Sequence, residues 1–168
     1  SKDIVKKIRA EKDKENRNIL KQKLPAICFS GEFSKRADNA LKKHSGYICL
    51  DFDGYKSNRD LLQEKERLSK DKYIYCVFIS PSGNGLKALV KIPPIADNHK
   101  SYFLSLQNYY DSEYFDKTCK NISRVCYESY DPLIHINAQS SLWDKIEEQE
   151  YIEVNKHSDI PTIPVTDE

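Results

Sequence analysis

Asp51 and Asp53, two acids one residue apart, are the side chains in this sequence best suited to chemistry. They follow the largely apolar residues 47–50, which favour a strand, and Gly54 ends the run. Because alternate side chains of a strand share a face, both carboxylates are expected to point the same way. Two carboxylates this close repel each other, and a bound divalent cation would relieve the repulsion. The alternative is a pair of solvated acids, since Asp is common where strands stop.

The loop from Ser80 to Lys87 combines serines, glycines and a lysine. Glycines let backbone N–H groups approach an anion closely, serines add hydroxyl donors, and the lysine adds a positive charge. The combination suits a triphosphate, although a plain turn would have the same composition. It is not a Walker loop, because the glycine spacing differs and no helix is expected after it. The predicted nucleotide-binding residues here are Ser80, Ser82, Gly83, Gly85 and Lys87.

Asp116 is a third candidate acid, and Arg124 follows it a few residues later. An arginine can bind a phosphate through two N–H groups at once. Asp131 is the competing acid, but it precedes Pro132, and an Asp before Pro more often bonds to the backbone of a turn. Asp116 is therefore predicted as the third metal ligand and Asp131 as a structural residue. Ordinary surface charge is the alternative for Asp116 and Arg124.

The elements that would position these residues alternate between strands and helices, with one hairpin. Predicted helices cover residues 1–23 (broken near 11–17), 34–44, 58–69 and 99–110. Predicted strands cover residues 26–29, 47–53, 73–79, 86–92 and 123–127. This mixture indicates a mixed α/β fold. The domain is expected at residues 24–143, after a helical segment at 1–23 and before an acidic, Pro-rich linker at 144–168.

The composition excludes several classes of protein. Lys and Arg number 27 against 26 Asp and Glu, so any nucleic-acid-binding surface must be local. No apolar run is long enough to span a membrane and no signal peptide opens the chain, which predicts a cytoplasmic protein without membrane contact. The five cysteines form no Cys-x-x-Cys pair, so buried, reduced thiols are expected and a zinc knuckle is not. The chain contains no Met and is interpreted as a piece of a longer protein.

The order of these motifs resembles the archaeo-eukaryotic primase superfamily, which has an acid-x-acid motif, a Ser-x-His motif and a hydrophobic-Asp motif. Residues 24–31, 80–87 and 122–132 look more closely like the N-terminal domain of virulence-associated E proteins, and the similarity covers roughly residues 3–143. The resemblance implies a primase–polymerase fold, in which an N-terminal α/β module joins an RRM-like catalytic sheet. It also implies primer synthesis on single-stranded DNA in mobile-element replication, with a helicase in the same chain or as a partner.

On this resemblance, Asp51, Asp53 and Asp116 would be catalytic and would hold Mg²⁺ or Mn²⁺, while Lys87 and Arg124 would contact the phosphates of nucleoside triphosphates. Nucleotidyl transfer uses two cations about 4 Å apart, so three carboxylates are a reasonable set of protein ligands. Some tyrosines could stack on template bases, although core packing is their more common role. These tyrosines are Tyr109, Tyr110 and Tyr127.

Two alternatives stay open. Lys87 stands where the superfamily has His, and a lysine binds phosphate but cannot hydrogen-bond as a neutral imidazole does. The first alternative is therefore a degenerate module that binds nucleotide or DNA and recruits a helicase. The second rests on residues 50–54, which also look like the opening of a haloacid-dehalogenase phosphatase. Against the second, Tyr55 stands where that family prefers Thr, and the motif lies deep in the chain.

Overall fold

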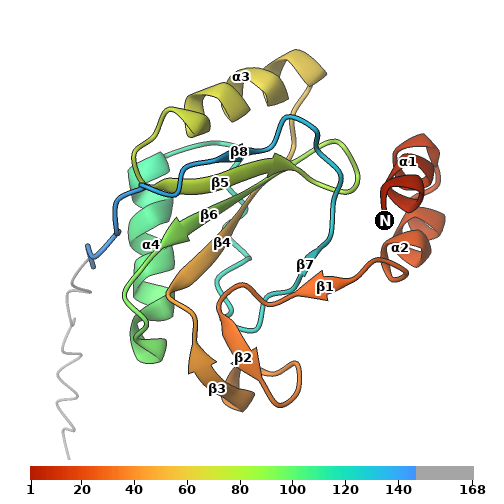
Figure 1. Cartoon of the computed structure of the whole chain (residues 1–168). Coiled ribbons are helices and arrows are strands. Elements are labelled where there is room, and N and C mark those ends of the chain that lie inside the picture. The colour runs from red at the N-terminus through yellow and green to blue at the C-terminus, as the bar shows by residue number, and fades with distance from the viewer. Residues whose placement is uncertain (147–168) are drawn as a thin grey trace, which may run out of the picture.

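A four-stranded antiparallel sheet forms the centre of the fold in a computed structural model that describes residues 1–146 (Figure 1). Its strands, in spatial order, are β4 (Tyr47–Phe52), β6 (Leu86–Lys91), β5 (Ile74–Ile79) and β8 (His135–Ile136). Helices α3 (Asn58–Ser69) and α4 (His99–Tyr110) lie on one face of this sheet. The predicted mixed α/β class is confirmed, as are the two predicted helices at 58–69 and 99–110.

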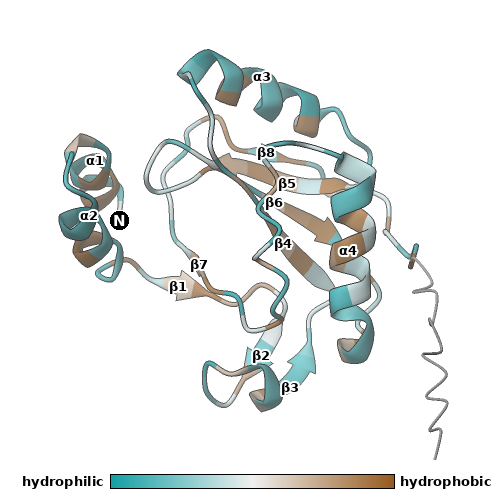
Figure 2. Ribbon diagram, turned by 180° about the vertical axis from the view of Figure 1, so that it is seen from behind, coloured by the Kyte–Doolittle hydropathy of each residue, from teal (hydrophilic) through white to brown (hydrophobic). Residues whose placement is uncertain are grey.

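The two faces of the sheet differ because side chains alternate along each strand. In β6, Leu86, Ala88 and Val90 are buried against the helices, whereas Lys87 and Leu89 lie on the opposite face. This is the orientation that the alternation predicts for Lys87. Figure 2 shows hydrophobic residues concentrated in these strands, whereas α3 is mostly hydrophilic with hydrophobic residues in a few places. Burial of such a face supplies most of the favourable free energy of folding.

Short strands and two helices lie on the other side of the sheet (Figure 1). Strand β1 pairs antiparallel with β7, and β2 pairs antiparallel with β3, a short 3₁₀ turn (η1) preceding β3. Helices α1 and α2 precede β1, and a second 3₁₀ turn (η2) precedes α4. Their bounds are α1 Lys2–Ala10, α2 Lys14–Lys21, β1 Ala26–Ile27, β2 Gly31–Phe33, η1 Asp38–Ala40, β3 Leu41–His44, η2 Ala96–Asn98 and β7 Cys126–Tyr127.

Helices α1 and α2 form a helical pair that is attached to the rest of the domain through a small apolar cluster. Val5, Ile8 and Leu24 are buried there, with Tyr127 and Tyr130 packed against them. The predicted break in the N-terminal helix is confirmed, since α1 and α2 are separate helices. Asp13 caps the second helix by accepting a hydrogen bond from the backbone N–H of Asn16 at 2.8 Å.

The predicted helix at 34–44 is wrong, because this segment forms the connection, with η1, and strand β3 of the β2–β3 hairpin. Asp38 accepts hydrogen bonds from the backbone N–H and the hydroxyl of Ser123, at 3.0 and 2.5 Å. His44 is buried, and its Nε2 lies 3.1 Å from Nδ1 of His99 at the start of α4. Contacts with distant segments therefore override the local preference of lysine and arginine for a helix.

Other boundaries shift by a few residues. The predicted strands at 26–29 and 123–127 shorten to two residues each, β1 and β7. The five cysteines all lie in the described part of the chain, and none of them forms a disulfide. Residues 147–168, most of the predicted linker at 144–168, lie outside the described residues. Within residues 1–146, no helix has the length and apolar character needed to cross a membrane.

Candidate metal and nucleotide site

Asp51 and Lys87 lie directly opposite each other on neighbouring strands, on the face of the sheet away from α3 and α4. The Lys87 ammonium donates to Oδ2 of Asp51 in an ion pair, and Asp51 is only 6% exposed. Burial alone would lower the pKa of Lys87, but the charges around it, above all the Asp51 carboxylate, raise this pKa above its ordinary value. Lys87 is therefore a permanent cation at this position.

Asp116 is held beside Asp51 by backbone hydrogen bonds. The chain after α4 runs past the end of β4, where the Asp116 N–H donates to the Asp51 carbonyl at 2.8 Å. One step further along, the Asp53 N–H donates to the Tyr114 carbonyl at 2.7 Å. Phe115, between the two bonds, is buried with its ring 5.3 Å from that of Phe52. The packing of Phe115 thus fixes the backbone of its neighbour Asp116.

Cys119 completes a close group with these two acids, and the sequence analysis did not find it. Its Sγ lies 3.2 Å from Oδ2 of Asp51 and 3.0 Å from Oδ2 of Asp116. Burial and the two carboxylates raise the pKa of the Cys119 thiol, so the sulfur carries a proton that it can donate. One ligand atom from each of the three residues lies within 4.8 Å of the others. The only feature of the sequence that could have indicated Cys119 is its position three residues after Asp116. This spacing allows the Cys119 N–H to close a turn on the Asp116 carbonyl.

Asp53 lies near this group but is not a member of it. A Cβ on Gly85 would stand 2.0 Å from Oδ1 of Asp53, so the carboxylate rests directly on the glycine. The pKa of Asp53 is raised, first by burial and then by the nearby charge of Asp51. Glycine at 85 therefore has a specific role, because any side chain would displace this acid.

The glycine loop is a tight turn that uses some of its own donors. The Ser80 N–H donates to the Gly85 carbonyl at 2.8 Å, and the Gly83 N–H donates to the Ser80 carbonyl at 2.9 Å. Gly83 has a φ of +78°, a conformation that other residues rarely adopt. Arg9 of α1 packs over the loop, with Cδ 3.2 Å from the position of a Cβ on Gly83. Ser82 lines the cavity beside this loop, whereas the Lys87 ammonium is already paired with Asp51.

A cavity of about 310 Å³ lies between this loop and helix α2. Basic residues of α2 face it from one side, because positions 14, 17, 18 and 21 share one helix face. Burial lowers the pKa of Lys21, and the neighbouring Arg17 lowers it further. The sequence analysis missed these residues, although their spacing was visible. The cavity is lined by Lys14, Arg17, Asn18, Lys21, Asp53, Gly54, Ser80, Pro81, Ser82, Asn84, Lys87, Val125 and Tyr127.

Arg124 lies beside the Asp116 loop and does not line the cavity. Its guanidinium donates to the Thr118 carbonyl at 3.1 Å, and its charge helps to lower the pKa of Asp116. Burial would raise the pKa of Asp116, but hydrogen bonds from Cys119 and Thr118 outweigh this effect. Arg124 thus supports the ionised form of Asp116 in this structure.

Asp131 lies in a different part of the fold. Its Oδ2 accepts from Lys65 Nζ at 2.6 Å and from the Ile79 N–H at 2.8 Å, and its Oδ1 accepts from the Leu133 N–H at 3.0 Å. Both oxygens are therefore engaged in holding the chain against β5 and α3.

Of the three tyrosines considered for base stacking, only Tyr127 lines the cavity. Tyr110 is buried against the Phe52 ring, with centroids 5.9 Å apart. Tyr109 packs against Trp143 at 4.7 Å. Tyr110 therefore takes part in core packing, the more common role of aromatic residues, whereas Tyr109 is 43% exposed and packs on Trp143 at the surface.

Fold and site together define a mixed α/β domain with a carboxylate–thiol group beside a basic cavity. The chain belongs to the family of BT4734-like N-terminal domains, which it matches over residues 19–135. The matched region runs from within α2 to the start of β8 and includes every predicted site residue. No curated protein and no solved structure matches the chain significantly.

Proposed function

We propose that this domain catalyses metal-dependent nucleotidyl transfer, synthesising primers on a single-stranded DNA template as primase–polymerases do. The observation that carries the proposal is the meeting of Asp51 and Asp116 at the end of β4, with Asp53 beside them and a basic cavity adjacent. Acids for metal binding and cations for a triphosphate thus lie next to each other, as this reaction requires.

The residues present fit Mg²⁺ or Mn²⁺. Oδ1 of Asp51 is buried and accepts no hydrogen bond from any residue within 1–146. A buried carboxylate oxygen without a partner is costly, and a cation that prefers oxygen ligands would satisfy it. Asp51, Asp53 and Asp116 would hold such ions. When bound, they would activate the attacking 3′-hydroxyl and neutralise the leaving pyrophosphate.

The protein's own cations would bind and orient the triphosphate. Lys14, Arg17 and Lys21 approach the cavity from α2, and Lys87 reaches it from β6. Once Asp51 is engaged by a metal ion, the Lys87 ammonium is free to turn toward a phosphate group. Lys87 would thereby serve as a phosphate ligand in the position where the superfamily has His.

The connectivity of the sheet supports the primase-like interpretation. Along the chain, β4, α3, β5, β6, α4 and β8 follow the β-α-β-β-α-β order of ferredoxin-like and RRM-like folds. One feature differs, since β8 pairs with β5 and not with β4. Residues 114–116 lie beside β4 instead, and this replacement brings Asp116 to the site.

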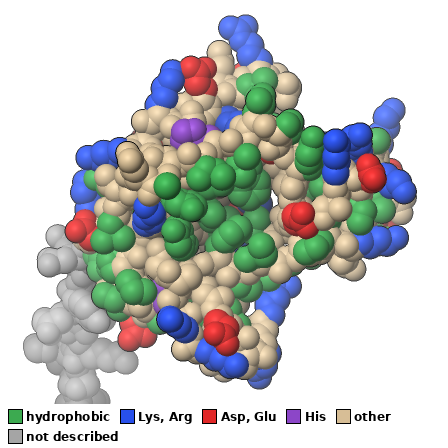
Figure 3. Space-filling view, in the orientation of Figure 1, with side chains coloured by type: hydrophobic (Ala, Val, Ile, Leu, Met, Phe, Trp, Pro, Cys, Tyr) green, Lys and Arg blue, Asp and Glu red, His purple; other side chains and the backbone are tan. Residues whose placement is uncertain are grey.

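An apolar cavity of about 410 Å³ on the open face of the sheet suits the bases of a single strand. Figure 3 shows hydrophobic side chains gathered at the centre of this face, with Lys and Arg over the α1–α2 pair. The apolar and basic cavities share Tyr127, so a strand could place bases in one and phosphates near the other. The aromatic residues that line the apolar cavity are Phe29, Tyr75, Phe78, Tyr127 and Tyr130.

A primer-synthesis assay tests the proposal. The chain is incubated with a single-stranded DNA template, labelled nucleoside triphosphates and Mn²⁺, and product lengths are measured. We expect products from the wild type and none from Asp51→Asn or Asp116→Asn. Nucleotide binding without any product, under Mg²⁺ and Mn²⁺ alike, would favour the degenerate module that recruits a helicase. The Lys87–Asp51 ion pair is the observation that favours this second candidate.

The phosphatase alternative finds little support in the geometry. That chemistry needs an aspartate that can attack a phosphate, whereas Asp51 is 6% exposed and paired with Lys87. A helicase, in the same chain or as a partner, remains the expected partner of the nucleotidyl-transfer activity.

A further inference from the structure

We propose that Cys119 makes the Asp51–Asp116 pair a site for a thiophilic divalent cation, with Zn²⁺ as the natural ligand, in competition with Mg²⁺. This inference shares two ligands with the proposed function, but it does not require nucleotidyl transfer to occur. Its consequence is that Zn²⁺ would occupy the carboxylates on which the reaction depends. The domain would therefore be inhibited by Zn²⁺ even when Mg²⁺ is abundant.

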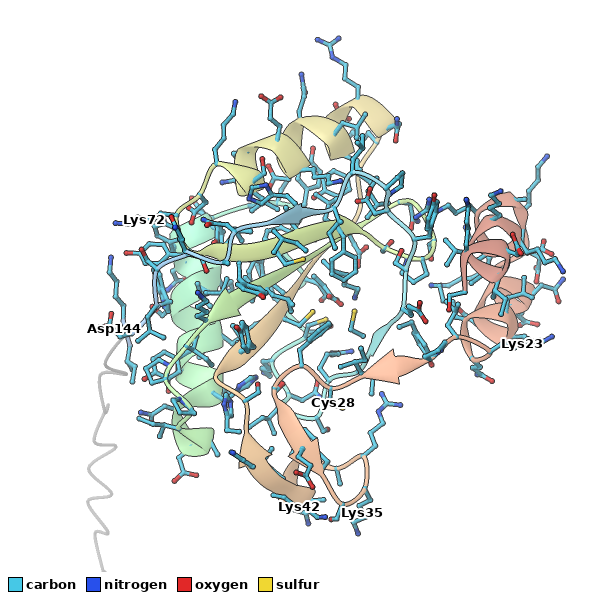
Figure 4. The ribbon with its side chains drawn as sticks, in the orientation of Figure 1. Lys23, Cys28, Lys35, Lys42, Lys72 and Asp144 are labelled. Atoms are coloured by element: carbon cyan, nitrogen blue, oxygen red, sulfur yellow. The ribbon has the colours of Figure 1, made fainter. Side chains whose placement is uncertain are left out.

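The geometry of the group suits one ion. The three ligand atoms lie within 4.8 Å of one another, close enough for a single cation to contact them all after small shifts. They come from two separate segments, since Asp51 lies on β4 whereas Asp116 and Cys119 lie in the turn that packs against it. Figure 4 shows side chains, some of them with sulfur atoms, in the space between the four-stranded sheet and the β1–β7 pair.

The orientation of Asp116 is fixed by a neighbour. Its Oδ1 accepts hydrogen bonds from the Thr118 N–H at 2.9 Å and from the Thr118 hydroxyl at 2.7 Å. This leaves Oδ2 directed at the thiol of Cys119, at 3.0 Å. Partners of this kind, which hold a metal ligand in place, are a regular feature of protein metal sites.

A second, independent observation points to a cation. Oδ1 of Asp51 is fully buried and has no hydrogen-bond partner in the described part of the chain, although Oδ2 of the same group has two. Asp51 as a whole is 94% buried, since 6% of its surface is exposed. A bound cation is the ligand that would satisfy this oxygen and offset the repulsion between Asp51 and Asp116.

The thiol decides which cation is preferred. Mg²⁺ is a hard ion that takes oxygen ligands in an octahedral shell, whereas Zn²⁺ and Cd²⁺ bind thiolate sulfur readily. On binding, the S–H bond of Cys119 breaks and its proton leaves to solvent. The electron pair that stays on sulfur forms the bond to the metal, and no oxidation is involved.

Cd²⁺ is the probe for a first test, because a cadmium–thiolate bond absorbs in the ultraviolet. The whole chain is titrated with Cd²⁺ alone, and we expect an absorption band that saturates at one ion per chain. Cys119→Ser should lose the band, and its affinity for Zn²⁺ should fall by at least the roughly 10- to 100-fold that loss of a residue supporting a metal ligand costs. Its affinity for Mn²⁺ should change far less, because a hydroxyl oxygen replaces the sulfur. Cys28→Ser, which removes a cysteine outside the group, is the matched control and should keep the band.

The proposal is overturned if Cys119→Ser and the wild type bind Cd²⁺ and Zn²⁺ equally, or if no band appears with the folded wild type. Circular dichroism shows whether Cys119→Ser is folded. If it is not, Asp116→Asn replaces it in the titration and is expected to weaken the band with all five thiols still present. A wild type that shows the band but makes no strand products leaves this inference standing and removes the proposed function. A wild type that makes strand products but shows no band supports the proposed function and overturns this inference.

Discussion

Lys87 of β6 and Asp51 of β4 are cross-strand neighbours that form a mostly buried ion pair. The pair offsets the cost of burying a carboxylate that is only 6% exposed, because the ammonium compensates its charge. It also places the lysine in competition with a metal ion for the same carboxylate. Binding of metal and release of Lys87 toward a phosphate are therefore expected to be coupled.

We predict that Lys87→Ala has opposite effects on the two ligands. Removal of the competing ammonium should tighten binding of Mn²⁺ alone, about tenfold, whereas loss of a charged phosphate ligand should weaken nucleoside triphosphate binding by 10-fold or more. Isothermal titration calorimetry measures both affinities. Lys87→His should keep part of the nucleotide affinity. If the nucleotide affinity of Lys87→Ala were unchanged, the glycine hairpin would be a plain turn without a role in nucleotide binding.

The same variant should also lose stability. Without Lys87, the Asp51 carboxylate is buried without its counter-charge, and removal of one partner of a buried pair costs about 3 kcal/mol. Urea unfolding of Lys87→Ala should therefore show this loss without metal and recover most of it with saturating Mn²⁺. A loss that Mn²⁺ does not restore would mean that the ion binds elsewhere.

Asp116→Asn is predicted to abolish strand extension while leaving Tm nearly unchanged. The amide keeps the size of the side chain and its oxygen can still accept the bonds from Thr118, but the negative charge that would attract a divalent cation is gone. Strand-extension assays and thermal unfolding, run on the same preparation, check both parts. Activity that survives in Asp116→Asn would contradict its role as a ligand.

Asp131→Asn is predicted to have the reverse effect. Its carboxylate is paired with the buried Lys65 at 2.6 Å, so loss of its charge should lower the free energy of unfolding by about 3 kcal/mol. Part of the activity should remain, because Asp131 is not in the Asp51–Asp116–Cys119 group. A stable Asp131→Asn variant without activity would instead bring Asp131 into the catalytic set.

The histidine pair predicts a pH-dependent stability. The Gly46 N–H donates to Nδ1 of His44, so Nε2 of His44 carries the hydrogen that it donates to His99. Burial, followed by the proximity of His44, lowers the pKa of His99 to about 4, whereas an unfolded histidine has a pKa near 6.5. The unfolded chain therefore takes up the proton first as the pH falls. Stability is complete above pH 6.5 and decreases from there to pH 4, by about 3 kcal/mol.

Chemical denaturation at several pH values between 4 and 7.5 measures this slope. His99→Gln removes the titrating group and should flatten that part of the curve, while acids such as Asp131 continue to contribute. An identical pH dependence in His99→Gln and in the wild type would contradict the assignment.

The spacing of apolar residues along the sequence predicted those helices and strands whose position depends on that spacing. Helices α3 and α4 follow from the spacing of their apolar residues, and the alternation along β6 places Lys87 on the face of Asp51. Segment 34–44 could not be assigned correctly, because its hairpin depends on contacts of Asp38 and His44 with residues far along the chain. Segment 34–44 is rich in lysine, and its apolar residues follow no periodicity that would distinguish a helix from a strand.

The three acids of the candidate site could be proposed from the sequence, but the position of Cys119 beside them could not. Asp51 and Asp53 stand in one strand-like run, whereas Cys119 joins Asp51 only because the chain after α4 turns back along β4. The basic face of α2 has visible spacing, but its position over the cavity depends on the β1–β7 pairing that follows it. From the sequence alone, the basic residues of α2 could therefore be interpreted as an ordinary solvent-exposed helix face.

The basic face of α2 is tested by the combined substitution of Lys14, Arg17 and Lys21 by alanine. All three line the cavity, so we expect both nucleoside triphosphate and single-stranded DNA to bind more weakly. Each cation that neutralises a phosphate adds about 0.7 to the slope of log affinity against log salt for a single strand. The triple variant should therefore reduce that slope by about 2, as measured by fluorescence anisotropy over a salt series.

A matched control removes the same charge from a different surface. Lys6, Lys7 and Lys12 are exposed on or just after α1 and do not line the cavity. Their combined substitution by alanine changes the net charge equally, so any effect of total charge alone would appear in both variants. We expect the salt slope of the control to stay close to that of the wild type. Equal losses in the two triple variants would show that α2 attracts the strand only through overall charge and makes no phosphate contact at the cavity.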